Sequence, residues 1–195
     1  MCSWCWAYKP TATKLFARLP KGVRRVNILG GLAADDDRPM PEDQQQAIAG
    51  HWHRIHDLLG TRFNFSFWEK CAPCRSTYPA CRAVIAAARQ GREEAMIEAI
   101  QRAFYLHAID PSEPAELLML AERIGLDSQQ FAADVASSAA NHELHRQVRF
   151  ARQSPIRGFP SLAIEVDGRL HPLNLDYRHH EPTVKQIEEL CSIRR

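Results

Sequence analysis

A long stretch with helical periodicity, residues 41–152, separates two shorter outer parts of this sequence. Before it, residues 23–29 have the composition of a short β-strand. After it, residues 161–173 read as two short strands joined by Asp167-Gly168, a pattern typical of a β-hairpin with a tight turn. Strands on both sides of a helical block favour one α/β sheet that carries an inserted helical subdomain. We therefore expect residues 1–40 and 153–195 to form one domain and residues 41–152 to form the insertion.

The remaining segments are predicted to be helical. Apolar residues recur at helical spacing, and glycines mark several of the expected ends. Ser112 is the expected N-cap of the helix over residues 114–124. The predicted helices cover residues 2–19, 41–59, 79–90, 92–108, 114–124, 127–152 and 182–193.

Composition limits the classes of function. The chain of 195 residues is 45% hydrophobic and 25% charged, with a formal net charge of +2, which is typical of a globular protein. Because no basic stripe stands out, we expect no nucleic-acid partner. No apolar run approaches the ~20 residues that a membrane span needs, and no signal peptide opens the sequence. We therefore expect a cytoplasmic protein without a membrane partner.

Six cysteines carry the most specific chemical signal. Two pairs have C-x-x-C spacing, Cys2-Ser-Trp-Cys5 and Cys71-Ala-Pro-Cys74. In a reducing compartment a framework of structural disulfides is not expected, so this spacing indicates either redox chemistry or half of a zinc site.

The first pair lies at the start of a predicted helix. A cysteine in that position is close to unpaired backbone N–H groups and to the positive end of the helix dipole, and both favour the thiolate. Cys2 is therefore the expected nucleophile. Cys5 lies one turn further along the helix and is expected to resolve the mixed disulfide that Cys2 forms.

Several motifs together resemble one known family. The sequence resembles the DsbA family of the thioredoxin fold, and within it the bacterial FrnE-like branch. That branch borders the 2-hydroxychromene-2-carboxylate isomerases and the kappa-class glutathione transferases. The residues that carry the resemblance are Met1-Cys2-Ser3-Trp4-Cys5-Trp6, Gly30-Gly31-Leu32, Arg75-Ser76-Thr77-Tyr78-Pro79-Ala80-Cys81-Arg82-Ala83 and Gly158-Phe159-Pro160-Ser161.

The resemblance implies a fold, an activity and a set of site residues. The implied fold is thioredoxin-like α/β with a large all-helical insertion, and the implied activity is thiol–disulfide exchange by Cys2 and Cys5. Pro160 is expected to be cis and to lie against the cysteine pair, and Phe159 to offer its backbone to a bound substrate. Trp4 is expected to contribute to an apolar substrate groove. Substrates would be proteins or small molecules with thiols or disulfides. No cofactor is expected, apart from exchange of the cysteine pair with glutathione.

One feature of the family pattern is absent from the sequence. Members of the family carry a β-strand before the C-x-x-C, in the middle of the sheet. This sequence begins one residue before Cys2, so it does not include that N-terminal strand. We expect either that translation starts further upstream or that the protein lacks the strand.

The second pair, Cys71 and Cys74, has three possible roles. It is a candidate second redox pair, because the insertion covers the active face in this family. The two cysteines are alternatively unpaired thiols at a helix start. A third role is a zinc site with Cys81 and one histidine. Such a site needs four ligands, and the sequence has no second compact pair of ligands to complete it, so we expect no metal.

Two other functions compete with disulfide exchange. The first is a glutathione-dependent isomerase or transferase of the kappa and hydroxychromene type, which activates glutathione with a single serine and needs no second cysteine. The second is a non-catalytic thioredoxin-like interaction module. The presence of both Cys2 and Cys5 favours redox chemistry over the first of these.

Overall fold

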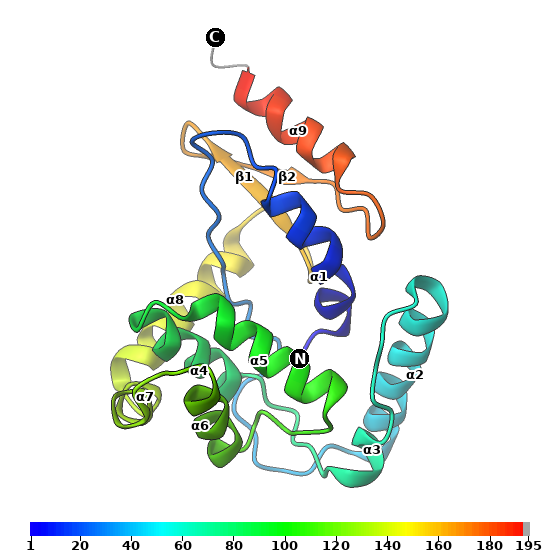
Figure 1. Ribbon diagram of the computed structural model, residues 1–195, viewed down its shortest axis with the longest axis vertical. Coiled ribbons are helices and arrows are strands. Elements are labelled where there is room, and N and C mark those ends of the chain that lie inside the picture. The colour runs from blue at the N-terminus through cyan, green and yellow to red at the C-terminus, as the bar shows by residue number, and fades with distance from the viewer. Residues whose placement is uncertain (193–195) are drawn as a thin grey trace.

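The computed structural model describes residues 1–192 and is mostly helical, with one two-stranded sheet (Figure 1). The predicted closing helix therefore has its last residue, Ile193, outside the described residues. The elements are α1 (Ser3–Phe16), α2 (Glu42–Leu59), α3 (Phe67–Lys70), α4 (Tyr78–Arg89), α5 (Glu93–Leu106), α6 (Pro114–Arg123), α7 (Ser128–Val135), α8 (Ser138–Gln153), β1 (Leu162–Val166), β2 (Arg169–Leu173) and α9 (Glu181–Ser192).

The hairpin and the two terminal helices pack together at one end of the molecule (Figure 1). Strands β1 and β2 pair antiparallel, with Leu162 opposite Leu173. Asp167 and Gly168 both have positive φ, as a tight hairpin turn requires, so the predicted turn is confirmed. Leu15 of α1 and Ile187 of α9 are buried against this sheet. This small core fixes α1, and with it the first cysteine pair.

The predicted strand over residues 23–29 is wrong, because this segment belongs to no strand. A β-strand needs a neighbour for its backbone groups, and β1 pairs only with β2 in the described part of the chain. Residues 23–29 instead run from α1 towards the helices as an irregular segment (Figure 1). Val26 is 68% exposed on it.

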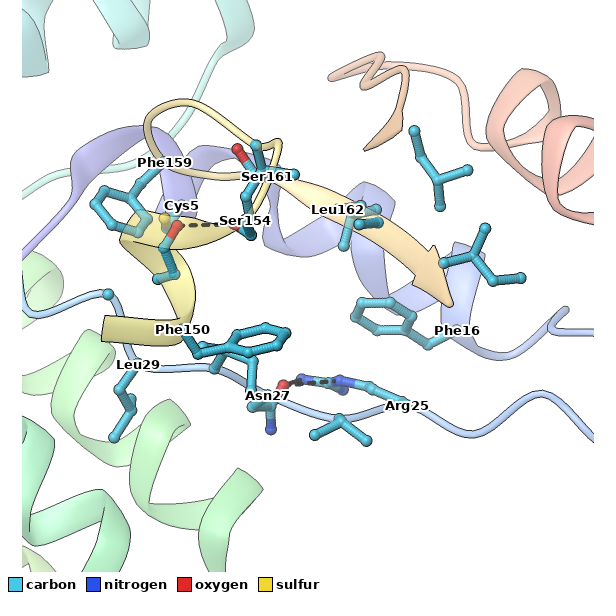
Figure 2. A pocket seen from close by; sticks show the side chains of 18 of the residues that line it. Cys5, Phe16, Arg25, Asn27, Leu29, Phe150, Ser154, Phe159, Ser161 and Leu162 are labelled. Carbon is cyan, nitrogen blue, oxygen red and sulfur yellow. Dashed lines mark hydrogen bonds between the residues drawn. The ribbon is translucent and has the colours of Figure 1, made fainter. Parts of the chain in front are cut away.

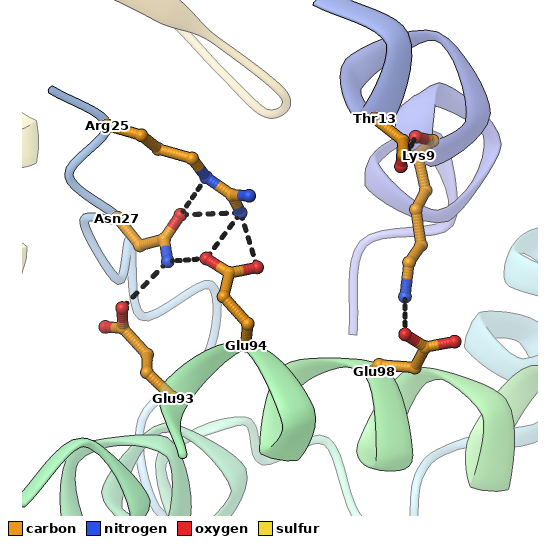
Figure 3. Close-up of polar contacts among 7 residues, drawn as sticks. All are labelled: Lys9, Thr13, Arg25, Asn27, Glu93, Glu94 and Glu98. Carbon is orange, nitrogen blue, oxygen red and sulfur yellow. Dashed lines mark hydrogen bonds and ion pairs between the residues drawn. The ribbon is translucent and has the colours of Figure 1, made fainter. Parts of the chain in front are cut away.

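Side chains tether this segment to α5 instead (Figure 3). Arg25 donates to Asn27 and to Glu94, and the Asn27 amide donates to both Glu93 and Glu94. Gly31 then lets the segment turn next to the helices, because it has a φ of +56° and a Cβ there would meet Val148.

The helical part of the chain forms a core of its own around α4. Buried alanines on α4 allow close approach of α5, α6 and α7. The predicted single helix over residues 127–152 is wrong, since α7 ends at Val135 and Ser137 caps α8 by accepting from the Ala140 N–H. Ser112 was also predicted wrongly as an N-cap: Glu113 holds that position, and the Ser112 side chain donates to Asp110.

An aromatic cluster joins α2, α3 and α5. Trp52 of α2 is fully buried at its centre. Six aromatic rings lie around it with centroid distances of 5.0 to 6.4 Å. They belong to Phe63, Phe65, Phe67, Trp68, Phe104 and Tyr105. Phe63 and Phe65 lie in the loop before α3, and Phe67 is the first residue of α3.

Candidate functional site

Cys2 lies at the start of α1, where backbone amides favour a thiolate. It is the N-cap residue, and the backbone N–H groups of Cys5 and Trp4 in the first turn contribute to lowering its pKa. The largest effect comes from the Cys5 thiol, whose hydrogen bond lowers the pKa of Cys2 to about 6 from 9.0, although burial opposes the shift. Cys2 is thus the thiol of this pair that ionises first.

Cys5 behaves in the opposite way. Its proton is engaged in the hydrogen bond to Cys2, and this interaction raises the pKa of Cys5, with burial and the negative charge of Cys2 adding to the effect. The pair therefore consists of one reactive thiolate and one protonated, more deeply buried thiol. This is the division of roles that a nucleophile and a resolving cysteine need.

Phe159 and Pro160 meet the cysteine pair from the other end of the chain. The Phe159–Pro160 peptide bond is cis. The Cys2 thiol donates to the Phe159 carbonyl at 3.5 Å, across a sequence separation of 157 residues. The structure thus places the backbone of residue 159 beside the Cys2 sulfur.

Trp4 has different surroundings from Phe159. Its ring packs edge-on against Tyr177, with centroids 5.3 Å apart. Tyr177 also contacts Tyr8, so an aromatic group stands on the outer side of α1. No sequence motif singles out Tyr177, which lies in the segment between β2 and α9.

A cavity of about 1000 Å³ opens beside the cysteine pair (Figure 2). It lies between residues 22–32 on one side and β1 with α1 on the other. Cys5 and Phe159 are at one end, and Phe16 and Leu162 line the other (Figure 2). Its walls are mainly apolar, and residues 23–29 form part of them.

Cys71 and Cys74 lack the features that activate Cys2. Cys71 follows the end of α3 and its thiol donates to the Ala108 carbonyl, while the Cys74 thiol donates to the Asp37 carbonyl. Burial raises the pKa of both thiols, and nearby carboxylates add to the shift. Neither sulfur lies at a helix N-terminus, and the charge of Lys70, which favours the Cys71 thiolate, is outweighed by burial and the carboxylates.

Within residues 1–192, no three His, Cys, Asp or Glu side chains gather in a way that would hold a metal ion. In the same range no helix has the length and apolar character that a membrane crossing requires.

The pKa of Cys2 leads to a first prediction. Because the thiolate is the reactive form, alkylation of Cys2 by iodoacetamide is expected to rise with pH around a midpoint near 6. Since the folded-state pKa lies below the unfolded value, the ionised thiol stabilises the reduced protein at high pH, and this stabilisation is lost as the pH falls through about 6. Peptide mass spectrometry measures the rate at Cys2 alone.

The matched variant is Cys5→Ala. It removes the hydrogen bond that contributes most to the shift, so the midpoint is expected to move up towards 9.0. An unchanged midpoint in this variant would show that the hydrogen bond is not the cause.

Gly30 leads to a second prediction. A Cβ at this position would collide with the ring of Phe159, whose carbonyl accepts from Cys2. Gly30→Ala is therefore expected to displace the ring and to slow disulfide exchange several-fold. Gly50→Ala is the control, since a Cβ there meets open space and alanine favours the helix by about 1 kcal/mol. Equal activity in both variants would contradict a role for the Phe159 position.

Solved structures with a similar fold match the whole chain. A candidate protein disulfide isomerase from Nitrosomonas europaea superposes with a TM-score of 0.81 and 27% identity, over 100% of this chain and 94% of that one. The cytosolic disulfide reductase DsbM from Pseudomonas aeruginosa gives a TM-score of 0.76 at 24% identity, over the same shares of the two chains.

Curated relatives are longer than this chain. The ClpXP adapter protein SpxH of Bacillus subtilis is 25% identical over 166 residues, which are 83% of this chain and 54% of SpxH. The chain thus spans about half the length of the curated relatives that it matches.

The family assignment follows from the sequence match and the fold together. Residues 1–176 match the DSBA-like thioredoxin domain, which is most of the chain. The predicted fold class is confirmed by this match and by the superposition on the Nitrosomonas europaea structure. This chain belongs to the family of DSBA-like thioredoxin domains, with a thioredoxin-like fold that is mostly helical and has a small antiparallel sheet.

Proposed function

We propose that this protein is a thiol–disulfide oxidoreductase in which Cys2 is the nucleophile and Cys5 the resolving thiol. One observation carries the proposal: the Cys2 sulfur lies at the N-cap of α1, beside the Cys5 thiol that lowers its pKa, and 3.5 Å from the Phe159 carbonyl. The first two features favour the thiolate, and the third lies beside the proposed path of an incoming disulfide.

The exchange consists of two displacements. The Cys2 thiolate attacks one sulfur of a substrate disulfide, so that a Cys2–substrate disulfide forms and the other substrate sulfur leaves as a thiolate. Cys5 then loses its proton and attacks the Cys2 sulfur. The second substrate thiolate leaves, and two electrons have passed from the cysteine pair to the substrate. The same steps in reverse oxidise a substrate dithiol.

Substrates are proposed to be proteins or small molecules with accessible thiols or disulfides. DsbM, which shares the fold, is a cytosolic disulfide reductase, and one of its structures contains GSH. We accordingly propose a cytoplasmic location and exchange with glutathione as the means of recycling the pair. Phe159, Pro160 and Trp4 are the proposed substrate contacts.

The test is catalysed reduction of a disulfide. With glutathione, NADPH and glutathione reductase, the protein is expected to accelerate reduction of hydroxyethyl disulfide above the uncatalysed rate. Cys5→Ser is expected to lower reduction of the protein disulfides of insulin by about tenfold or more, because the mixed disulfide on Cys2 is no longer resolved intramolecularly.

The Cys5→Ser variant also distinguishes the proposed oxidoreductase from a kappa-type glutathione transferase or isomerase. An enzyme that only activates glutathione would retain full activity as Cys5→Ser and would conjugate glutathione to 1-chloro-2,4-dinitrobenzene. That pair of results would replace the oxidoreductase proposal with a glutathione transferase or isomerase.

A non-catalytic role is the second candidate function. The observation that favours it is the match to SpxH proteins, which are ClpXP adapters. An interaction module needs no reactive pair. A protein that folds normally but neither reduces nor oxidises any disulfide would support this role over the first.

A further inference from the structure

The first turn of α1, which carries both cysteines, has few of the local interactions that usually hold a helix start. Its N-cap residue is Cys2, whose side chain makes no capping hydrogen bond within residues 1–192, and no acidic residue stands in the turn. The first backbone hydrogen bond, from the Trp6 N–H to the Cys2 carbonyl, is 3.3 Å long. Because weakly held helix ends fray, this turn needs support from outside the helix.

The Trp6 side chain supplies such support by joining the turn to the helical part of the chain. Its Nε1–H donates to the Arg62 carbonyl, in the loop between α2 and α3, at 3.0 Å. Its ring stacks on Tyr105 of α5, with centroids 5.6 Å apart and an angle of 16° between the planes. The hydrogen bond sets the direction of the indole and the stacking sets its plane, so the two contacts together fix the side chain.

The groups that hold the indole belong to a well-packed part of the protein. Tyr105 is 0% exposed, and Trp52 and Phe63 pack edge-on against it at 5.3 and 5.6 Å. The Asn64 N–H donates to the Tyr105 carbonyl at 2.7 Å, and this bond ties the loop between α2 and α3 to α5. The indole is thus attached to the aromatic cluster of α2, α3 and α5.

A second contact lies one turn further along α1. The Lys9 Nζ is 5.8 Å from the centre of the Trp6 ring and 3.6 Å from the Glu98 carboxylate of α5 (Figure 3). This ion pair is partly exposed, so water weakens it and it contributes little stability by itself. Trp6 therefore provides the stronger of the two attachments of α1 to α5.

Trp6 is also linked to both cysteines through the backbone. It directly follows Cys5, and its N–H donates to the Cys2 carbonyl. Residues four apart lie on the same side of a helix, so Trp6 lies one turn below Cys2. If the indole leaves the aromatic cluster, the turn that holds the two cysteines loses its attachment. The Cys2 thiolate depends on this turn, since the groups that lower its pKa belong to it.

We propose that Trp6 is a positioning residue, which fixes the first turn of α1, and with it the arrangement of Cys2 and Cys5, by attaching that turn to α5 and to the loop between α2 and α3. The inference deepens the proposed function and rests on it, because this is the pair proposed to exchange disulfides. It gives the helical part of the chain a role in the chemistry. That part holds the reactive end of α1, while the sheet and α9 hold the other end through Leu15.

The test compares variants of the full chain by the pH dependence of Cys2 alkylation. Trp6→Phe keeps a ring that can stack on Tyr105 but removes the donor to Arg62, and Trp6→Ala removes both. Trp68→Phe is the matched control, because Trp68 packs in the same aromatic cluster and its Nε1 has no hydrogen-bond partner within the described residues. Iodoacetamide labelling of the reduced protein, followed by peptide mass spectrometry, gives the midpoint at Cys2.

Loosening the first turn is expected to raise this midpoint. Trp6→Ala should raise it by about one pH unit or more, which is about a tenfold change in the balance between thiolate and thiol. Trp6→Phe should raise it by a smaller amount, and Trp68→Phe should leave it unchanged. Disulfide exchange should fall in the same order. A loss of stability without a change in the arrangement of the cysteines would lower the melting temperature and leave the midpoint in place, so thermal denaturation accompanies each measurement.

The outcomes separate this inference from the proposed function. An unchanged midpoint in folded Trp6→Ala overturns the inference. An equal shift in Trp68→Phe overturns it as well, because any loss of packing in the cluster would then have the same effect. If Trp6→Ala does not fold, the comparison of Trp6→Phe with Trp68→Phe decides by the same criteria. If the midpoints shift as expected but wild-type Cys2 and Cys5 form no reversible disulfide in glutathione buffers, the positioning role stands and the proposed function fails.

Discussion

Cys2→Ser is expected to abolish disulfide exchange, with a loss of at least about a thousandfold, because it removes the sulfur that forms the mixed disulfide. The hydrogen bond from Cys5 and the amides of α1 remain, but a serine hydroxyl does not ionise in this range. Reduction of insulin or of hydroxyethyl disulfide measures the effect. The variant should fold normally, since the change replaces sulfur by oxygen at a partly exposed position.

Two control variants define the specificity of that result. Cys191→Ser changes a partly buried cysteine on α9, distant from Cys2 in the sequence, and Cys71→Ser changes a thiol whose pKa is raised. Both are expected to retain most of the wild-type rate. Full activity in Cys2→Ser, together with loss of activity in Cys71→Ser, would move the chemistry to the helical part of the chain.

Trp52→Ala is expected to cause the largest loss of stability. The side chain is fully buried among six aromatic rings, and its removal leaves a cavity that rigid rings fill poorly. The free energy of unfolding should fall by about 3–5 kcal/mol in a urea titration. Disulfide exchange should fall with it, because Tyr105 and Trp6 link the same cluster to α1.

Trp52→Phe and Trp4→Ala are the controls for packing. The first keeps a ring at the centre of the cluster and should cost less than Trp52→Ala. The second removes a ring that packs only against Tyr177 at the side of α1, with a small expected effect on unfolding. A loss below about 1 kcal/mol in Trp52→Ala would show that the aromatic cluster is not a main source of stability.

Local patterns in the sequence predicted most of the secondary structure. The tight turn depends on two adjacent residues, Asp167 and Gly168, which both adopt positive φ. Helix α2 ends at Gly60, which adopts the left-handed conformation. These signals are local, and tertiary contacts did not override them. The same reasoning places Cys2 at a helix N-terminus.

The failures have a different cause. Residues 23–29 have the side chains of a strand, but strand formation depends on a neighbour, and the cavity beside this segment offers none. The break between α7 and α8 depends on Ser137, whose side chain caps α8, and no glycine or proline marks it. The apolar periodicity continues across this break, so the sequence predicts one helix instead of two.

The candidate site was predictable only in part. Cys2 and Cys5 share a motif, and the resemblance linked them to Phe159 and Pro160 at the other end of the chain. The stacking of Tyr105 on Trp6 could not be predicted, since it arises from the contact of α5 with α1, which the order of residues does not reveal.

The central claim is that Cys2 and Cys5 form the redox-active pair. The most direct measurement is a glutathione redox titration with thiol trapping and peptide mass spectrometry, which reports every cysteine separately. The account predicts a reversible Cys2–Cys5 disulfide with a single midpoint, which would also show whether the pair favours oxidation or reduction of substrates. A Cys71–Cys74 disulfide that forms reversibly, with Cys2 and Cys5 never paired, would contradict it.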